Sequence, residues 1–214
     1  MVSQQNGGSV ARSKSSQNWL KEHHQDSYVL QARREGYRSR AVYKLAEIQK
    51  KDKILKPGQL VLDLGAAPGA WSEYASQLIG DRGRVIALDL LAMEPIAGVD
   101  FLQGDFTEAE TLNALLGLID NHEFDLVLSD MAPNLSGMGS VDQPRAIYLA
   151  ELAFDLAGQI LQPNGVFVIK LFQGEGFEQL ISGFRQTFKS VKFRKPDASR
   201  ARSREIYAVC AGLK

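Results

Sequence analysis

Two charged residues stand near the ends of apolar runs, where they could act on a bound substrate. Asp130 directly follows the run LVLS, and Lys170 lies inside the apolar run VFVIKLF. A buried, unpaired ammonium is costly, so Lys170 needs a carboxylate partner or a path to water. An ion pair with Asp130 would meet that need in a purely structural way. Charges gathered beside a ligand site also favour catalysis, so the residues alone leave both interpretations open.

A glycine-containing turn indicates a second chemistry, the binding of a nucleoside cofactor. Gly65 and Gly69 bracket the turn in VLDLGAAPGAW, and glycine lets a backbone pass close to a ligand. The turn lacks the middle glycine of the dinucleotide fingerprint G-x-G-x-x-G and the G-K-[ST] of a P-loop. We therefore expect a cofactor that has no pyrophosphate.

Three acids accompany this turn. Asp63 lies in the run before it, Asp89 ends the run RVIALD, and Asp105 follows the next short run. In Rossmann-type sheets an acid at the end of the second strand accepts hydrogen bonds from ribose hydroxyls. Each acid could instead cap a helix or sit in a loop. Together with the glycine turn they predict a cofactor site, beside which Trp71 could pack, although a core role suits Trp71 equally well.

The order of elements predicts an α/β fold with a mostly parallel sheet. Short runs rich in Val, Ile and Leu alternate with helical patterns from Gln59 onward. We expect strands at 60–65, 84–90, 100–103, 126–130, 166–172, 191–194 and 206–211. We expect helices at 39–51, 71–79, 108–119, 144–161 and 176–188, with a short helical turn after Leu91. The last two strands leave no room for a helix between them, so one of them should be antiparallel.

Length and composition predict one domain preceded by a tail. Residues 1–30 are polar and aperiodic, which is typical of a flexible segment, and residues 31–214 suffice for one α/β core. Cys210 is the only cysteine, and the three histidines lack partners at ligand spacing, so we expect neither an internal disulfide nor a metal. No run of eighteen apolar residues and no secretory pattern occurs, which predicts a cytoplasmic protein away from membranes, most simply a monomer.

The net charge of zero conceals a strong segregation of charge. Residues 1–56 carry 12 Lys and Arg against 5 Asp and Glu, residues 57–184 carry 4 against 18, and residues 185–214 carry 9 against 2. Two basic ends on an acidic body suit a polyanion such as RNA, although two solvated tails would give the same counts. The candidate RNA-binding residues are Arg33, Arg34, Arg38, Arg40, Arg194, Lys195, Arg200 and Arg202.

Several motifs together resemble those of the FtsJ/RrmJ-type ribosomal RNA 2′-O-ribose methyltransferases. They are GYRSRAVYKL, VLDLGAAPGAW, DFLQGDF, SDMAPN, VIKLFQGEG and KPDASRARSREIYAV, and the match runs from about Asn18 to the C-terminus. The resemblance implies a Rossmann-like sheet of seven strands, one of them antiparallel, with helices on both faces. It also implies S-adenosylmethionine as cofactor and a uridine of large-subunit ribosomal RNA as substrate, within the large subunit or a late assembly particle.

The same resemblance assigns roles to individual residues. It implies a catalytic Lys-Asp-Lys-Glu set at Lys44, Asp130, Lys170 and Glu205. It also implies that Gly69, Trp71, Asp89, Asp105 and Asp130 contact the cofactor. Ala70 departs from the family, in which a second glycine often stands at this position.

Two other functions fit parts of the sequence. An NAD(P)-dependent oxidoreductase could share the fold class, but the glycine turn disfavours it. A non-catalytic RNA-binding factor in ribosome assembly could share the basic ends. Such a factor would have no need of Lys44, Asp130, Lys170 and Glu205 together.

Overall fold

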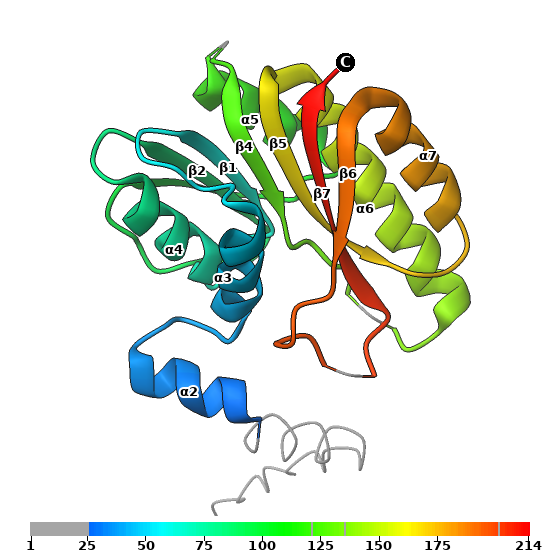
Figure 1. The fold of residues 1–214 in the computed structure, drawn as a ribbon, viewed down its shortest axis with the longest axis horizontal. Helices are drawn as coiled ribbons and strands as arrows, with labels where there is room; N and C mark the ends of the chain where they lie inside the picture. Colours follow the sequence, from blue (N-terminus) through cyan, green and yellow to red (C-terminus); the bar gives the residue numbers. More distant parts are fainter. Residues whose placement is uncertain (1–25, 121, 135, 201) are drawn as a thin grey trace, which may run out of the picture.

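The computed structural model describes residues 26–120, 122–134, 136–200 and 202–214, which form a seven-stranded sheet with helices on both faces (Figure 1). The strand order is β3-β2-β1-β4-β5-β7-β6. The strands are β1 Leu60–Leu64, β2 Arg84–Asp89, β3 Val99–Gln103, β4 Phe124–Ser129, β5 Leu161–Phe172, β6 Phe188–Arg194 and β7 Glu205–Leu213. The predicted fold class is therefore confirmed.

The last strand runs against its neighbours, as expected from the missing crossover helix. β7 pairs antiparallel with both β5 and β6, whereas the other pairs in the sheet are parallel. All seven predicted strands are present, and the largest error lies in β5. It begins at Leu161, five residues earlier than expected, because Leu161 pairs with Phe124 across an irregularity in the β4 register.

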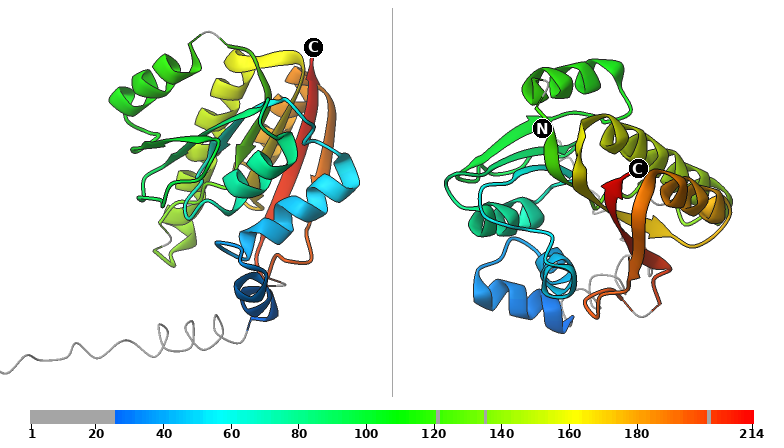
Figure 2. Two further views of the ribbon diagram at one scale, coloured as in Figure 1. Left: turned by 90° about the vertical axis from the view of Figure 1, so that its left-hand side faces the viewer. Right: turned by 45° about the horizontal axis from the view of Figure 1, so that its top comes forward.

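Alternating side chains of the strands feed two separate cores. On one face, Val61, Leu128 and Val168 pack against helices α3 (Ala41–Asp52) and α4 (Ala70–Ile79). On the other face, Leu62 and Phe167 pack against α5, α6 and α7. These three helices span Ala109–Ile119, Gly139–Ile160 and Phe177–Thr187, and Figure 2 shows the two helical layers from the side. Because strand residues alternate between faces, neighbours such as Val61 and Leu62 enter different cores.

Three helical details differ from the expectation. Helix α2 (Ser27–Glu35) was not predicted, and it starts before the expected tail boundary at residue 30. Its N-terminus is capped by Asp26, which accepts the Tyr28 N–H at 3.0 Å. No helix lies between β2 and β3, where Pro95 interrupts the chain. Helix α6 begins at Gly139, ahead of Pro144, since Asp142 accepts the backbone N–H groups of the preceding turn.

Three of the expectations concern the tail, membrane spans and metal ligands. The expected flexible tail falls almost wholly on residues 1–25, outside the described residues, and the division into tail and domain stays a prediction. None of the helices in the described ranges is long and apolar enough to cross a membrane. Within the same ranges, no three His, Cys, Asp or Glu side chains gather as metal ligands would.

Candidate active site

The carboxyl edge of the sheet brings together the four residues of the expected catalytic set. Lys170 lies near the end of β5, and its antiparallel neighbour β7 starts at Glu205, so Phe172 pairs with Glu205 and Lys170 with Tyr207. Asp130 directly follows β4. Lys44 comes from α3, which packs on the face of the sheet that also carries Tyr207. The sheet topology and the packing of α3 thus place residues from four distant segments at one edge.

These four residues form two ion pairs. The Lys170 Nζ lies 3.0 Å from Asp130 Oδ1 and also donates a hydrogen bond to the Asp130 backbone carbonyl. The Lys44 Nζ lies 2.9 Å from Glu205 Oε1. The Lys170 side chain is only 8% exposed and the Lys44 side chain 12%. Dissolved salt screens buried ion pairs much less than exposed ones. Both ammonium groups are therefore held firmly by their carboxylate partners.

Tyr207 links the two pairs, and the sequence analysis missed it. Its hydroxyl donates to Asp130 Oδ1 at 2.6 Å and accepts from Lys44 Nζ at 3.1 Å. Burial, together with the charges of Asp130 and Glu205, raises the pKa of Tyr207 well above its ordinary value, so the hydroxyl stays neutral. Strand alternation could have suggested it, since Tyr207 stands two residues after Glu205 and faces the same side.

Both carboxylates of the cluster are ionised. Burial alone would raise the pKa of Asp130, but Lys170 and Lys44 more than offset burial and bring that pKa below its ordinary value. Burial would likewise raise the pKa of Glu205, which Lys44 brings below its ordinary value. The cluster therefore contains two carboxylates that stay charged across the neutral range.

A cleft of about 510 Å³ opens beside this cluster at the ends of β1, β2 and β4. Such a volume suits a nucleoside-sized ligand. Of the expected cofactor residues, Gly65, Asp89, Asp105 and Asp130 line the cleft. Gly65 has a φ of 79°, and a Cβ there would lie 2.8 Å from the Met131 backbone nitrogen, so only glycine fits.

Two of the acids that line the cleft, Asp89 and Asp105, also hold its walls in place. Asp89 accepts the Ala67 and Leu91 backbone N–H groups, both at 2.8 Å, and so holds the glycine turn and the loop after β2. Asp105 accepts from the backbone nitrogen and hydroxyl of Thr107, which lowers the pKa of Asp105. We expected these carboxylates to meet the cofactor, and in the structure they also position loops.

The remaining expected cofactor residues lie behind the cleft rather than in its wall. Asp63 is fully buried and accepts the Ser72 hydroxyl at 2.6 Å through Oδ2, while Oδ1 has no partner among the described residues. Burial raises the pKa of Asp63 to about 7, and the nearby charges of Asp130 and Asp89 add to this effect. A buried acceptor beside two further acids suits a ligand that carries positive charge.

Trp71 and Gly69 serve the frame of the site. The Trp71 indole donates to the Ala41 carbonyl at 2.7 Å, and its ring lies 5.7 Å from that of Tyr207, so Trp71 packs in the core between α3 and the sheet. Gly69 precedes α4 with a φ of 101°, and a Cβ there would lie 2.6 Å from Ile96. Both contacts favour structural roles over direct contact with a ligand.

Several of the basic residues expected to meet RNA have partners inside the protein. Arg38 donates to the carbonyls of Pro68, Glu94 and Pro95 at 2.9–3.3 Å and thereby clamps the loop before β3 to the glycine turn. Arg194 makes a two-point contact with Asp52 at 2.6 and 2.7 Å. Such bidentate pairs fix geometry, so we expect Arg38 and Arg194 to hold the fold.

The other basic candidates divide in the same way. Arg40 pairs with Asp26 and donates to the Ala198 carbonyl, and Lys195 donates to the carbonyls of Ser203 and Glu205. Arg200 lies 4.0 Å from Asp26. Arg33, Arg34, Lys195 and Arg202 are exposed, and Arg202, like Lys195, also interacts with another residue of the protein. Contact with RNA stays a prediction for all eight residues.

The sheet order, the nucleoside-sized cleft and the Lys-Asp-Lys-Glu cluster beside it define a Rossmann-like methyltransferase. Comparison with known proteins agrees, since the family model described as FtsJ-like methyltransferase matches residues 37–213. The chain therefore belongs to the FtsJ-like methyltransferase family. It is 58% identical over 205 residues to the ribosomal RNA large subunit methyltransferase E of Hahella chejuensis, covering 96% of this chain and 100% of that one.

Solved structures show the same fold. A protein described as a ribosomal RNA methyltransferase from Plasmodium falciparum superposes with a TM-score of 0.72 at 28% identity, covering 83% of this chain and 98% of that chain. A protein described as an rRNA methylase from Clostridium thermocellum gives a TM-score of 0.54 at 18% identity, covering 78% and 96%. At that identity the second similarity concerns the fold alone. The family resemblance and the methyltransferase fold are thus confirmed, while the roles of single residues stay predictions.

Proposed function

We propose that this chain transfers a methyl group from S-adenosylmethionine to the 2′-hydroxyl of a uridine in large-subunit ribosomal RNA. The observation that carries the proposal is the cluster of Lys44, Asp130, Lys170 and Glu205 at the rim of the nucleoside-sized cleft. The 58% identity to a protein named ribosomal RNA large subunit methyltransferase E supports the choice of substrate.

The residues around the cleft fit this cofactor. Asp89 and Asp105 can accept hydrogen bonds from hydroxyl and amine groups of an adenosine, and Gly65 leaves room for it beside Met131. Asp63, buried behind the cleft wall, adds negative charge close to Asp89 and Asp130 without touching the ligand. S-adenosylmethionine supplies an activated methyl group on a positively charged sulfur. The neighbouring carboxylates of Asp63, Asp89 and Asp130 suit that charge.

The cluster acts on the ribose. A ribose hydroxyl is a weak nucleophile, and holding its oxygen in line with an activated methyl group is the enzyme's main task. Lys170 faces two acceptors, the Asp130 carboxylate and carbonyl, so we expect a protonated side chain that donates to the hydroxyl oxygen and stabilises the negative charge that develops on it. As the oxygen bonds to the methyl group, the hydroxyl proton passes to the Asp130 carboxylate, which lines the cleft and is ionised across the neutral range. Lys44, held by Glu205 and Tyr207, orients the ribose from the helix side.

A protonated Lys170 gives the reaction a distinctive pH dependence. At saturating cofactor and RNA, kcat should stay nearly constant between pH 6 and pH 8. If a neutral lysine acts as the general base, kcat must rise about tenfold per pH unit until the lysine is fully deprotonated. The pH profile of kcat therefore separates the two roles that the sequence left open.

The setting of the reaction follows from the substrate. We propose that the protein acts as a monomer in the cytoplasm, on ribosomal RNA within the large subunit or a late assembly particle. The proposal includes no metal ion and no membrane.

Incubation with labelled S-adenosylmethionine tests the proposed function. The full chain is mixed with isolated ribosomal RNA, large subunits or assembly particles that lack the modification, and the RNA is then digested to nucleosides. We expect label in 2′-O-methyluridine from large-subunit RNA. Label in a base, or stoichiometric RNA binding with no label in any fraction, would contradict the proposal, and the second result would favour a non-catalytic assembly factor.

A further inference from the structure

A second groove lies at the amino ends of the strands, away from the ion-pair cluster. It measures about 410 Å³ and lies between the end of α3, the starts of β4 and β5, and the strands β6 and β7. Val166 lines it and stands four residues before Lys170 on the same face of β5. At about 3.3 Å per residue, the groove lies roughly 13 Å from Lys170 along the strand. One RNA molecule can therefore reach both places.

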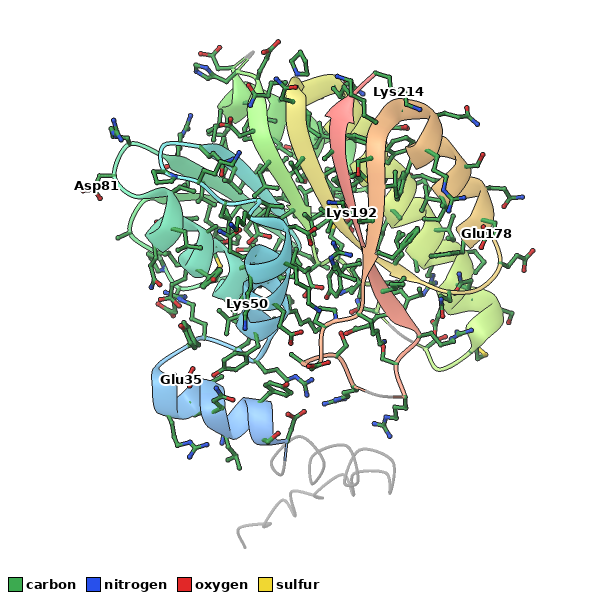
Figure 3. The ribbon with its side chains drawn as sticks, viewed as in Figure 1. Glu35, Lys50, Asp81, Glu178, Lys192 and Lys214 are labelled. Atoms are coloured by element: carbon green, nitrogen blue, oxygen red, sulfur yellow. The ribbon has the colours of Figure 1, made fainter. Side chains whose placement is uncertain are left out.

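Lysines surround this groove. Lys53, Lys56 and Lys192 line it, and Lys50 and Lys51 are exposed on the last turn of α3. Figure 3 labels Lys50 on α3 and Lys192 on β6, the two elements that flank this part of the sheet. We call Lys53, Lys56 and Lys192 with the groove that they line the lysine groove. The gathering of like charges from two distant segments, residues 50–56 and β6, suits a polyanion.

Two acids, Asp52 and Asp125, line the lysine groove and offset only part of the positive charge of the surrounding lysines. Asp52 is engaged by the two-point contact with Arg194, and Lys192 lies only at 3.9 Å from it. Asp125 accepts from the Leu60 backbone and from the Gln162 amide. The side chains of Lys53 and Lys56 make no hydrogen bond or ion pair with any described residue.

Local structure explains only part of this pattern. Lys50 and Lys51 stand in the last turn of α3, where positive charge stabilises the helix dipole. That effect fades within one turn, so it does not account for Lys56, and Lys192 belongs to a strand. Lys56 and Lys192 therefore add repulsion between like charges without stabilising a helix dipole.

The lining indicates which form of RNA fits. No aromatic side chain lines the lysine groove among the described residues, so it offers no surface on which an unpaired base could stack. It does offer polar groups, including Asn164 and Ser190, beside the ammonium groups. Double-helical RNA is recognised mainly through phosphates and 2′-hydroxyls, which are the groups that such a lining can bind.

We propose that the lysine groove binds the backbone of a double-helical segment of the substrate RNA, away from the nucleotide that is methylated. This inference rests on the proposed function for the identity of the RNA. It extends that function by adding a surface for the flanking helix. Binding there should increase affinity without taking part in the chemistry.

The test removes three charges from the lysine groove of the full chain. The variant combines Lys53→Asn, Lys56→Gln and Lys192→Gln, with Asn chosen because Lys53 has a left-handed φ of 51°. A matched control removes three exposed charges that do not line the lysine groove, through Arg82→Gln, Arg185→Gln and Lys214→Gln. Thermal unfolding of both variants checks that the fold is kept.

Binding is measured with a 16-base-pair RNA duplex, a single-stranded RNA of equal length and isolated large-subunit RNA, between 50 and 200 mM KCl. We expect the groove variant to bind the duplex and the large-subunit RNA about tenfold more weakly at low salt than the control. Its slope of log affinity against log salt should be smaller by up to about 2.7, because each of the three lost phosphate contacts removes about 0.9. Methyl transfer should show a raised KM for RNA and an unchanged kcat.

Two results would overturn the inference. Duplex affinity and salt slope equal to those of the control would remove the lysine groove from RNA binding. Loss of single-strand binding as large as the loss of duplex binding would contradict the double-helical occupant. Duplex binding is measured without cofactor, so a failure of methyl transfer by the unaltered chain would count against the proposed function and leave the groove's test intact.

Discussion

The two edges of the sheet carry positive charge in opposite ways. At the carboxyl edge, Lys44 and Lys170 are about 10% exposed, and each lies within 3.0 Å of a carboxylate. At the amino edge, the Lys192 side chain is 57% exposed and 3.9 Å from its nearest acid. Paired, buried charges hold one geometry and respond little to salt, whereas exposed ones attract a polyanion and are screened. We therefore propose that the first edge carries out the chemistry and that the second provides affinity for RNA.

Removing Lys170 should have the largest effect. Lys170→Ala should lower kcat about 10³-fold, because the ribose oxygen loses the group that stabilises its charge. Binding of S-adenosylmethionine and RNA should change little, since other residues hold them. Single-turnover methylation, with calorimetry for the cofactor, checks both parts. Turnover within tenfold of the unaltered chain would show that the buried pair is only structural.

Asp89→Ala should have the next largest effect, on cofactor affinity. The carboxylate holds the glycine turn and the loop after β2, and it faces the cleft. Its loss should weaken cofactor binding about 10- to 100-fold, which corresponds to roughly 1.5–3 kcal/mol. Calorimetry measures this, and Asp100→Ala at an exposed position of β3 serves as the control. Equal affinities for the two variants would remove Asp89 from the cofactor site.

The raised pKa of Asp63 predicts a pH-dependent affinity for the cofactor. With a pKa of about 7, only about a tenth of Asp63 is ionised at pH 6, and nine-tenths at pH 8. A cationic ligand prefers the ionised form, so affinity should rise about tenfold over this range. Without ligand, the folded chain binds more protons than the unfolded chain between pH 4 and pH 7, so Asp63 lowers stability as pH rises there.

Asp63→Asn is the control for this prediction. The substitution keeps a polar side chain next to Ser72 but removes the titration. Calorimetric titrations between pH 6 and pH 8 should then show weak affinity that changes less with pH than in the unaltered chain. The same pH dependence in both proteins would place the titrating group elsewhere.

The smallest effect is expected on the outer face of α2. Arg38 donates to three backbone carbonyls, so its substitution would also disturb the fold. Arg33 and Arg34 are exposed and therefore test the expected N-terminal RNA contact more cleanly. Arg33→Gln with Arg34→Gln should raise the KM for RNA several-fold and lower the salt slope by up to about two. Methylation assays at several salt concentrations measure both. An unchanged KM and slope would make these arginines a solvated helix face.

The sequence predicted the sheet well because strand patterns and the missing crossover are local signals. The positions of Asp130, Lys170 and Glu205 at one edge followed from the family topology. Tyr207 escaped notice because an aromatic residue in an apolar strand is typical of a core. Its role depends on hydroxyl contacts with Lys44 and Asp130, which are distant in the sequence.

The basic ends show where counting charges fails. Composition cannot distinguish an arginine that is free to meet a ligand from one that is held within the fold. Arg38 binds loop carbonyls and Arg194 pairs with Asp52 of α3, so both are of the second kind. Helix α2 was missed because it buries only Val29 and Ala32, a weak periodic signal. Its position depends on the pairing of Asp26 with Arg40 and on the nearby Arg200.

The most direct test of the division between the two edges is the salt dependence of single-turnover methylation by the unaltered chain. The maximal rate constant at saturating RNA and the half-saturating RNA concentration are measured between 50 and 200 mM KCl. The account predicts a maximal rate constant that stays within about twofold, because buried pairs are screened little, and a half-saturating concentration that rises steeply. A maximal rate constant that falls as steeply as affinity would contradict it.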